Sequence, residues 1–238
     1  MAGSTIRRTS RSNPTGAACT AGELGALAEV LLDHPHVQVL TDEIYDEIWY
    51  EPGRVPSVAG VEPRLTDRVF LTNGVSKTYA MTGWRIGYGA GNAELVGAIN
   101  TLQSQISSCP SSIGQAAATA ALTGDQSFVR DCVSVYRGRR DEAVKRINDT
   151  PGLSCTPPSG GFYAFVNCAG VIGGRTPSGD EIRPDEEFAA HLLESRRVAV
   201  IHGAAYGAPR YFRIAFATSH DILTAACEGI ARAGADLS

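Results

Sequence analysis

The N-terminal part of the chain alternates between one helical pattern and three short apolar runs, and this alternation limits the fold most strongly. Thr20 and Glu23 have the spacing of a capping box, and leucines at helical intervals predict a helix that ends near Asp33. Apolar runs with β-branched residues predict strands at 37–41, 68–72 and 84–90. A capped helix followed by short buried strands favours an α/β layer architecture with a mainly parallel sheet.

The rest of the chain is first helical and then mixed. Helical patterns are predicted at 92–122, with an interruption near Cys109 and Pro110, and at 125–148. The elements after Pro151 are shorter, with strands at 161–168, 198–201 and 211–217 and helices at 185–196 and from Ser219 to about 233. This change predicts a smaller C-terminal α+β domain. We place the boundary along the helix 125–148, which gives domains of residues 1–135 and 136–238.

Composition excludes several classes of function. The chain is 43% hydrophobic, has a net charge of −4, and contains no block of like charges and no apolar run of bilayer length. We therefore expect no nucleic-acid partner and no membrane partner. Residues 1–11 are basic and polar, so we predict neither a secretory signal nor a buried strand there. The six cysteines and five histidines show no metal-ligand spacing, which favours reduced thiols in a cytoplasmic protein without a metal site.

Lysine use is the first indication of chemistry. The chain has two lysines, Lys77 and Lys145, against nineteen arginines. Lys77 lies in a loop rich in glycine and hydroxyl groups that follows the strand 68–72, with Arg85 eight residues later. An arginine cannot replace a lysine as an amine nucleophile, because its guanidinium stays protonated. This lysine can form a Schiff base with an aldehyde cofactor, and the arginine can bind that cofactor's phosphate.

Asp42 shares the placement of Lys77 at the carboxyl end of a predicted strand. In open α/β sheets, ligands bind beyond the carboxyl ends of the strands, so we expect the two residues to meet there. Each residue also has a purely structural explanation when it is taken singly. Lys77 could be a surface lysine, Asp42 could cap a helix, and Arg85 could belong to an ion pair.

Four segments occur together, in order, as they do in one family. The run 74–87 resembles the lysine signature of the class I/II aminotransferases, which are fold type I enzymes that use pyridoxal 5′-phosphate (PLP). Asn-Pro-Thr-Gly at 13–16, Asp-Glu-Ile-Tyr at 42–45 and Phe-Arg-Ile at 212–214 resemble further motifs of that family. Residues 81–88 look most like the bacterial aspartate aminotransferases. The resemblance implies a partial fold type I large domain with a mostly parallel sheet, followed by an α+β small domain.

The resemblance implies a role for each cofactor-contacting residue. Lys77 would hold PLP as a Schiff base and act as general base and acid. Asp42 would pair with the pyridine nitrogen, and Tyr45 and Asn13 would bond the ring's 3′-oxygen. Arg85 would hold the phosphate, with the Ser76 hydroxyl beside it.

The substrate contacts are implied in the same way. Arg213, with Asn13, would take the substrate α-carboxylate through its planar fork of donors. The function implied is transfer of an amino group from an aspartate-like amino acid to a 2-oxo acid such as 2-oxoglutarate. Two alternatives stay open: another PLP enzyme of this fold, such as a C–S lyase, and a remnant without catalysis.

The length of the chain differs from that of the family. Family members are substantially longer and form homodimers with shared active sites, so the resemblance implies an N-terminally truncated chain. We expect the strand at 37–41 to lack a neighbour on one side and to expose unpaired backbone groups. The side-chain specificity for the substrate and the oligomeric state are not fixed by these motifs.

Overall fold

The computed structural model describes residues 5–9 and 13–238, with the side chains of residues 6–9 excepted. Contacts divide the chain into two compact units. Unit 1 holds the described residues before Asn13 together with Ala18–Val133, and unit 2 holds Asn13–Ala17 together with Ser134–Ser238. The boundary falls within the long helix α5 (Ser127–Asn148). We describe the two units separately.

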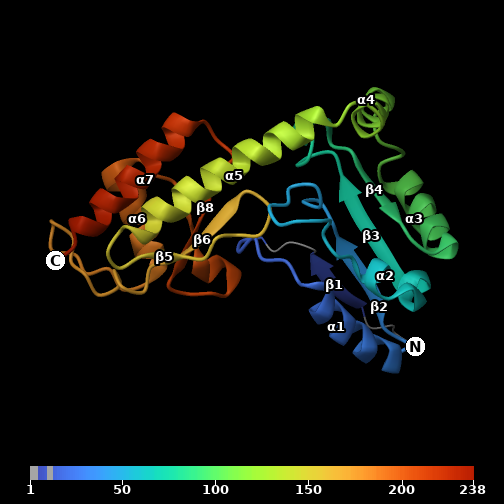
Figure 1. Ribbon diagram of the computed structural model, residues 1–238, viewed down its shortest axis with the longest axis horizontal. Helices are drawn as coiled ribbons and strands as arrows, with labels where there is room; N and C mark the ends of the chain where they lie inside the picture. The colour runs from blue at the N-terminus through green and yellow to red at the C-terminus, as the bar shows by residue number, and fades with distance from the viewer. Residues whose placement is uncertain (1–4, 10–12) are drawn as a thin grey trace. The chain divides into compact units, whose positions relative to one another are not determined.

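Unit 1 is built on a four-stranded sheet of order β1-β2-β3-β4 (Figure 1). Three of its strands run parallel and the last pairs antiparallel. The bounds are β1 Thr5–Thr9, β2 Gln38–Asp42, β3 Val69–Gly74 and β4 Gly87–Ala90. The predicted mainly parallel sheet is therefore confirmed. The fourth strand is shorter than predicted because residues Thr82–Trp84 form a 3₁₀ turn, η2.

Strand β1 corrects the prediction for the N-terminal segment. Residues Thr5–Thr9 pair in parallel with β2, from Thr5 opposite Gln38 to Thr9 opposite Asp42. Backbone groups make these bonds, so a strand with two arginines can add to a sheet edge, and its threonines and isoleucine favour the extended backbone. The expectation that β2 lacks a neighbour on one side was therefore wrong.

One face of the sheet packs on helices through an apolar core. Helix α1 (Ala21–Asp33) contributes Leu24, Ala28 and Leu31, each 2% exposed or less. Val39 of β2 and Val69 of β3 belong to the same cluster. The short elements α2 (Val58–Val61) and η1 (Pro63–Arg68) add Val58 and Leu65. Burial of one leucine of this kind stabilises the fold by about 1.5–3 kcal/mol.

The capping box predicted for α1 is present. The Thr20 hydroxyl accepts a hydrogen bond from the Glu23 backbone N–H at 3.2 Å, and a Glu23 carboxylate oxygen accepts from the Thr20 N–H at 2.8 Å. Two of the backbone donors that a helix start leaves unpaired are thereby satisfied.

Thr20→Ala should lower the free energy of unfolding of unit 1 by about 1 kcal/mol, because the hydroxyl acceptor is lost. Both tryptophans of the chain, Trp49 and Trp84, lie in unit 1, so their fluorescence during urea unfolding reports on this unit. Glu23→Gln is the matched control, since glutamine also completes a capping box. Equal midpoints for Thr20→Ala and the parent would refute the role of the cap.

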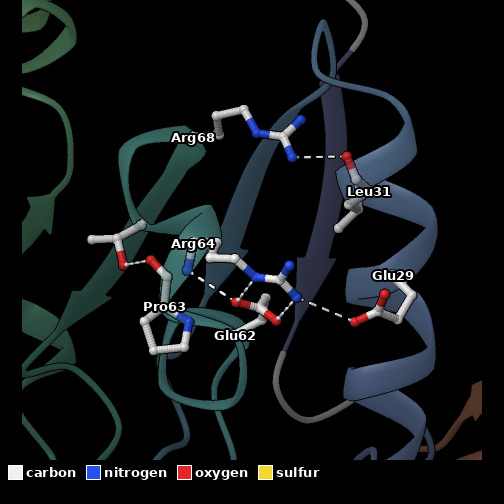
Figure 2. Close-up of polar contacts among 7 residues, drawn as sticks. Glu29, Leu31, Glu62, Pro63, Arg64 and Arg68 are labelled. Carbon is white, nitrogen blue, oxygen red and sulfur yellow. Dashed lines mark hydrogen bonds and ion pairs between the residues drawn. The ribbon is translucent and has the colours of Figure 1, made fainter.

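The two arginines of η1, Arg64 and Arg68, differ in their hydrogen-bond partners (Figure 2). Arg68 donates to three backbone carbonyls between the last turn of α1 and the start of β2: Leu31 at 2.7 Å, His34 at 2.8 Å and Val37 at 3.2 Å. Arg64 instead pairs on the surface with the Glu62 carboxylate at 2.6 Å. This hydrogen bond lowers the pKa of Glu62 to about 2. Arg68 therefore fixes the end of α1 to the start of β3.

Two helices follow the sheet of unit 1, α3 (Ala93–Ile106) and α4 (Ser112–Thr123), with the predicted interruption between them. Their large apolar side chains are mostly in contact with solvent: Leu102 is 62% exposed, Ile106 81% and Ile113 74%. Among the described residues, no helix combines the length and the apolar character needed to cross a bilayer.

Unit 2 has a four-stranded antiparallel sheet of order β5-β6-β8-β7. Figure 1 labels β5, β6 and β8 of this sheet. The strands are β5 Ser154–Cys155, β6 Tyr163–Asn167, β7 Ile201–His202 and β8 Tyr211–Ala215. The other elements are α6 (Asp185–Arg196), the turn η3 (Gly203–Tyr206) and α7 (His220–Ala235), which Ser219 caps as predicted. The predicted α+β character of this part is confirmed.

The period of two along β6 and β8 separates two faces of this sheet. Ala164 and Val166 of β6 and Phe212 and Ile214 of β8 are buried. The alternate residues of both strands are largely half-buried and carry polar or aromatic groups: Tyr163, Phe165, Tyr211 and Arg213. The first set forms the core of unit 2, and the second set forms the opposite face of the sheet.

Candidate active site

In unit 1 the structure places Asp42 and Lys77 after neighbouring parallel strands. Asp42 is the last residue of β2 and lies opposite Thr72 of β3. Strand β3 ends at Gly74, three residues before Lys77. Parallel strands point their carboxyl ends to the same edge, so both residues lie at the edge where open α/β sheets bind ligands.

The loop that carries Lys77 is closed at its base. Gly74 lies opposite Gly87 of β4, and the Val75 N–H donates to the Ile86 carbonyl at 3.3 Å. A Cβ on Gly74 would lie 2.9 Å from that carbonyl oxygen, so the close approach requires glycine here. The Val75 side chain is fully buried against Ile86 and Ala118. The lysine loop is thus held by strand pairing and by a small core beneath it.

Two residues of this loop adopt a backbone conformation that is rare outside glycine. Ala80 has φ of 53° and Arg85 has φ of 55°. Such left-handed residues cost free energy and concentrate at functional sites. Arg85 is exposed, and its Nη1 donates to the Thr82 carbonyl at 3.0 Å. Among the described residues, no carboxylate lies within ion-pair distance of this guanidinium.

Lys77 and its neighbours combine partial and full burial. Lys77 and Ser76 are half-buried, and Thr78 is buried. Within residues 5–9 and 13–238, the Thr78 hydroxyl finds no hydrogen-bond partner. Tyr79 donates from its hydroxyl to the Gln126 side chain at 2.9 Å, and burial is the main cause of its raised pKa.

The turn after β2 carries Tyr45 and a contact that the sequence did not indicate. Tyr45 is 8% exposed, and an Asp42 carboxylate oxygen accepts from the Ile44 N–H at 3.3 Å. Asn73 donates from its amide to Asp46 at 2.8 Å, and so joins this turn to the end of β3. No pattern in the sequence points to a pair of residues 27 positions apart. The contact is visible only once β2 and β3 are known to be neighbours.

In unit 2 the structure brings Asn13 and Arg213 together. Arg213 Nη1 donates to Asn13 Oδ1 at 2.6 Å, across 200 positions of sequence. The Asn-Pro-Thr-Gly turn is fixed to the same unit, since the Gly160 N–H donates to the Gly16 carbonyl at 3.1 Å. Gly16 has φ of +65°, and a Cβ there would lie 2.4 Å from Pro158 Cβ. This glycine is therefore required both by its conformation and by the lack of space.

Arg213 lies on the aromatic face of the unit 2 sheet. Its guanidinium carbon is 4.2 Å from the ring centre of Tyr163 and 5.5 Å from that of Tyr206. Its Nε is buried and has no hydrogen-bond partner within the described part of the chain. No described carboxylate pairs with it either. The sequence motifs did not indicate these tyrosines, although a period of two places Tyr163 and Arg213 on one face of paired strands.

The described part of the chain holds no group of three or more histidine, cysteine, aspartate or glutamate side chains arranged to bind a metal ion. All six cysteines are free thiols. Burial raises the pKa of Cys155 and Cys227 to about 11 and that of Cys168 to about 12, so these three are poor nucleophiles near neutral pH.

Comparisons with known proteins identify the family of the chain. The family model described as aminotransferase class I and II matches residues 5–230. An aspartate aminotransferase of Rhizobium meliloti strain 1021 is 50% identical over 224 residues, which are 94% of this chain and 55% of that protein. A probable aspartate/prephenate aminotransferase of Rhizobium leguminosarum is 48% identical over 223 residues, with 94% and 56% covered.

Solved structures support the same assignment. The crystal structure of the aspartate aminotransferase from Rhizobium meliloti matches with a TM-score of 0.95 and 48% identity, over 98% of this chain and 58% of that one. The chain spans about half the length of the curated relatives it matches. Because the family model covers residues 5–230, which are most of the chain, the chain belongs to the class I and II aminotransferases.

Proposed function

We propose that this chain carries the cofactor-holding and substrate-holding residues of a PLP-dependent aminotransferase. The reaction is transfer of the amino group of an aspartate-like amino acid to a 2-oxo acid such as 2-oxoglutarate. One observation supports this most. Lys77, one of the two lysines of the chain, follows β3, and the neighbouring parallel strand β2 ends at Asp42. Relatives named aspartate aminotransferase support the substrate class.

The domain organisation is part of the proposal. Residues 1–135 represent the C-terminal part of a PLP-binding large domain, and residues 136–238 represent the small domain. The two compact units meet between Val133 and Ser134, which supports a boundary within α5. The segment Asn13–Ala17 belongs to unit 2, although it precedes most of unit 1 in the sequence. The homodimer that the family resemblance implies is also part of the proposal, for the complete protein.

Aminotransferases of this family depend on PLP, and the donor set of unit 1 fits that cofactor. Lys77 supplies the amine for its aldehyde, Asp42 a carboxylate for its ring nitrogen, and Tyr45 a phenol for its 3′-oxygen. Arg85 and the Ser76 hydroxyl supply donors for its phosphate. The absence of any described acidic partner for Arg85 leaves its charge available to an anion, which is the structural feature that favours the fit.

The chain's own residues then have defined tasks. Bound PLP supplies an electron-withdrawing ring that weakens the Cα–H bond of an amino acid. The Asp42 carboxylate keeps the ring nitrogen protonated by pairing with it. The Lys77 amine would take the proton from the substrate Cα as general base and, as general acid, would give it to C4′ of the cofactor. Arg213 holds the α-carboxylate by two parallel N–H donors, and Asn13 orients that guanidinium through its Oδ1. We also propose that Asn13 forms a hydrogen bond to the 3′-oxygen of the cofactor ring.

A single-turnover experiment tests the proposed function. The chain is loaded with PLP, freed of excess cofactor and mixed with aspartate without any oxo-acid acceptor. We expect oxaloacetate in an amount equal to the bound cofactor, because one half-reaction can run once. A second reaction with cystathionine in place of aspartate tests the lyase alternative, because β-elimination needs a thiol leaving group on Cβ. Release of a thiol, pyruvate and ammonia from cystathionine over many turnovers would show a lyase, and no product from either amino acid on a PLP-loaded chain would show a remnant without catalysis.

A further inference from the structure

We propose that Tyr206 is a positioning residue for Arg213, and that Asp185 holds it in place through the turn η3. The inference rests on the proposed function, because it takes Arg213 as the residue that binds a carboxylate. All the residues involved belong to unit 2, so the inference needs no contact between the two units.

Arg213 has an unusual environment for a partly buried cation. Its charge is met by the faces of aromatic rings and by one amide oxygen, that of Asn13. Removing water from a guanidinium that has no acidic partner costs free energy, and aromatic rings offset part of that cost. A guanidinium held in this way is ready to receive a carboxylate, since no carboxylate among the described residues must first be displaced.

Tyr163 and Tyr206 reach Arg213 by different routes. Tyr163 is on β6, two residues from the partner of Arg213 in the sheet, so strand pairing alone sets its position. Tyr206 ends the 3₁₀ turn η3, which no sheet ladder fixes. Its ring packs edge-on against Phe165 at 6.1 Å. The position of Tyr206 therefore depends on what holds the turn.

Asp185 is the residue that holds this turn. It is 2% exposed at the start of α6, and its two oxygens accept from the backbone N–H groups of Ala204 at 2.8 Å and Arg210 at 3.2 Å. Burial alone would raise the pKa of Asp185, but these backbone donors outweigh burial and hold that pKa below its ordinary value. The carboxylate thus fixes both ends of the segment 204–210.

The start of the turn η3 is closely packed. A Cβ on Gly203 would lie 2.2 Å from the Ala208 carbonyl oxygen and 2.8 Å from Tyr211 Cβ. The turn therefore lies directly on β8, two residues before Arg213. The geometry joins Asp185, η3 and Tyr206 to the guanidinium in one continuous set of contacts.

The test follows the side-chain Nε–H signal of Arg213 by ¹H–¹⁵N NMR, identified by its loss in Arg213→Lys. Propionate is the probe, because it carries a carboxylate without an amine or an oxo group, and propionamide is the neutral control. We expect propionate, and not propionamide, to shift this signal in the full chain without cofactor. Tyr206→Leu should weaken propionate binding about three- to tenfold, from the loss of one cation–π contact.

Conservative variants separate positioning from simple stability. Tyr206→Phe keeps the ring and should bind propionate as the parent does. Asp185→Asn keeps one acceptor oxygen of the carboxylate and should broaden or displace the Arg213 signal while Trp fluorescence of unit 1 is unchanged. Equal propionate affinity in Tyr206→Leu and the parent would overturn the inference, as would a parent that does not bind propionate. Neither result touches PLP attachment at Lys77, so failure of the inference and failure of the proposed function are distinguishable.

Discussion

Lys77→Ala should abolish the borohydride-stable PLP adduct of this chain, whereas Lys145→Ala should leave it unchanged. Borohydride reduces a Schiff base between a lysine and PLP to a stable secondary amine. Lys77 is half-buried at the carboxyl edge of the unit 1 sheet, while Lys145 is exposed on α5. Since the chain has no third lysine, the only other amine is the N-terminus. Absorbance at the short-wavelength end of the visible spectrum measures the Schiff base before reduction, and peptide mapping after reduction identifies the labelled lysine.

A second variant separates charge from nucleophilicity at the same position. Lys77→Arg keeps the positive charge but cannot form the Schiff base, because a guanidinium stays protonated. It should therefore behave as Lys77→Ala in the trapping experiment. Adduct retained in either variant, or label found on the peptide that contains Lys145, would contradict the assignment of Lys77.

Much of the fold was predictable because its signals are local. The capping box at Thr20, the helix 185–196 and the Ser219 cap depend on residues within one or two turns, and the structure has each of them. The edge position of Lys77 and Asp42 followed from strand order alone. The carboxyl ends of parallel strands lie at the same edge of a sheet, so the predicted parallel sheet was enough to expect Asp42 and Lys77 at that edge.

The features that were missed depend on contacts between distant segments. Strand β1 was not predicted, because its pairing with β2 uses backbone groups and leaves no apolar signature. The tyrosines around Arg213 and the Asp185 contacts to η3 arise from residues that meet only after the sheet forms. The association of Asn13–Ala17 with unit 2 is of the same kind, since the sequence places these residues just before α1.

Arg68→Ala should lower the free energy of unfolding of unit 1 by about 2–4 kcal/mol, the largest loss we expect from one surface-accessible side chain. Its half-buried guanidinium donates to three backbone carbonyls, and charge-assisted bonds of this kind contribute about 1.5–3 kcal/mol each when they are shielded. Water can reach the carbonyls in the variant, so the sum is not fully lost. The urea midpoint of Trp fluorescence measures the change.

Arg64→Ala is the matched control, four residues away on the same 3₁₀ segment. Arg64 is 64% exposed and pairs with carboxylates in solvent, so we expect a much smaller shift of the midpoint than for Arg68→Ala. The lowered pKa of Glu62 makes any contribution of this pair present above the usual pKa of 4.5 and lost as the pH falls toward 2. Similar shifts for the two variants at neutral pH would contradict the distinction between them.

Arg68→Ala also connects the stability of unit 1 with the lysine loop. Arg68 directly precedes β3, and β3 ends three residues before Lys77, so the contact at one end of the strand supports the loop at the other. Loss of the α1 contact should therefore lower the temperature at which PLP is released from Lys77, in step with the loss of Trp signal. If PLP release did not move while unit 1 unfolded earlier, the lysine loop would be held by Val75 and Ile86 alone, independently of the strand that precedes it.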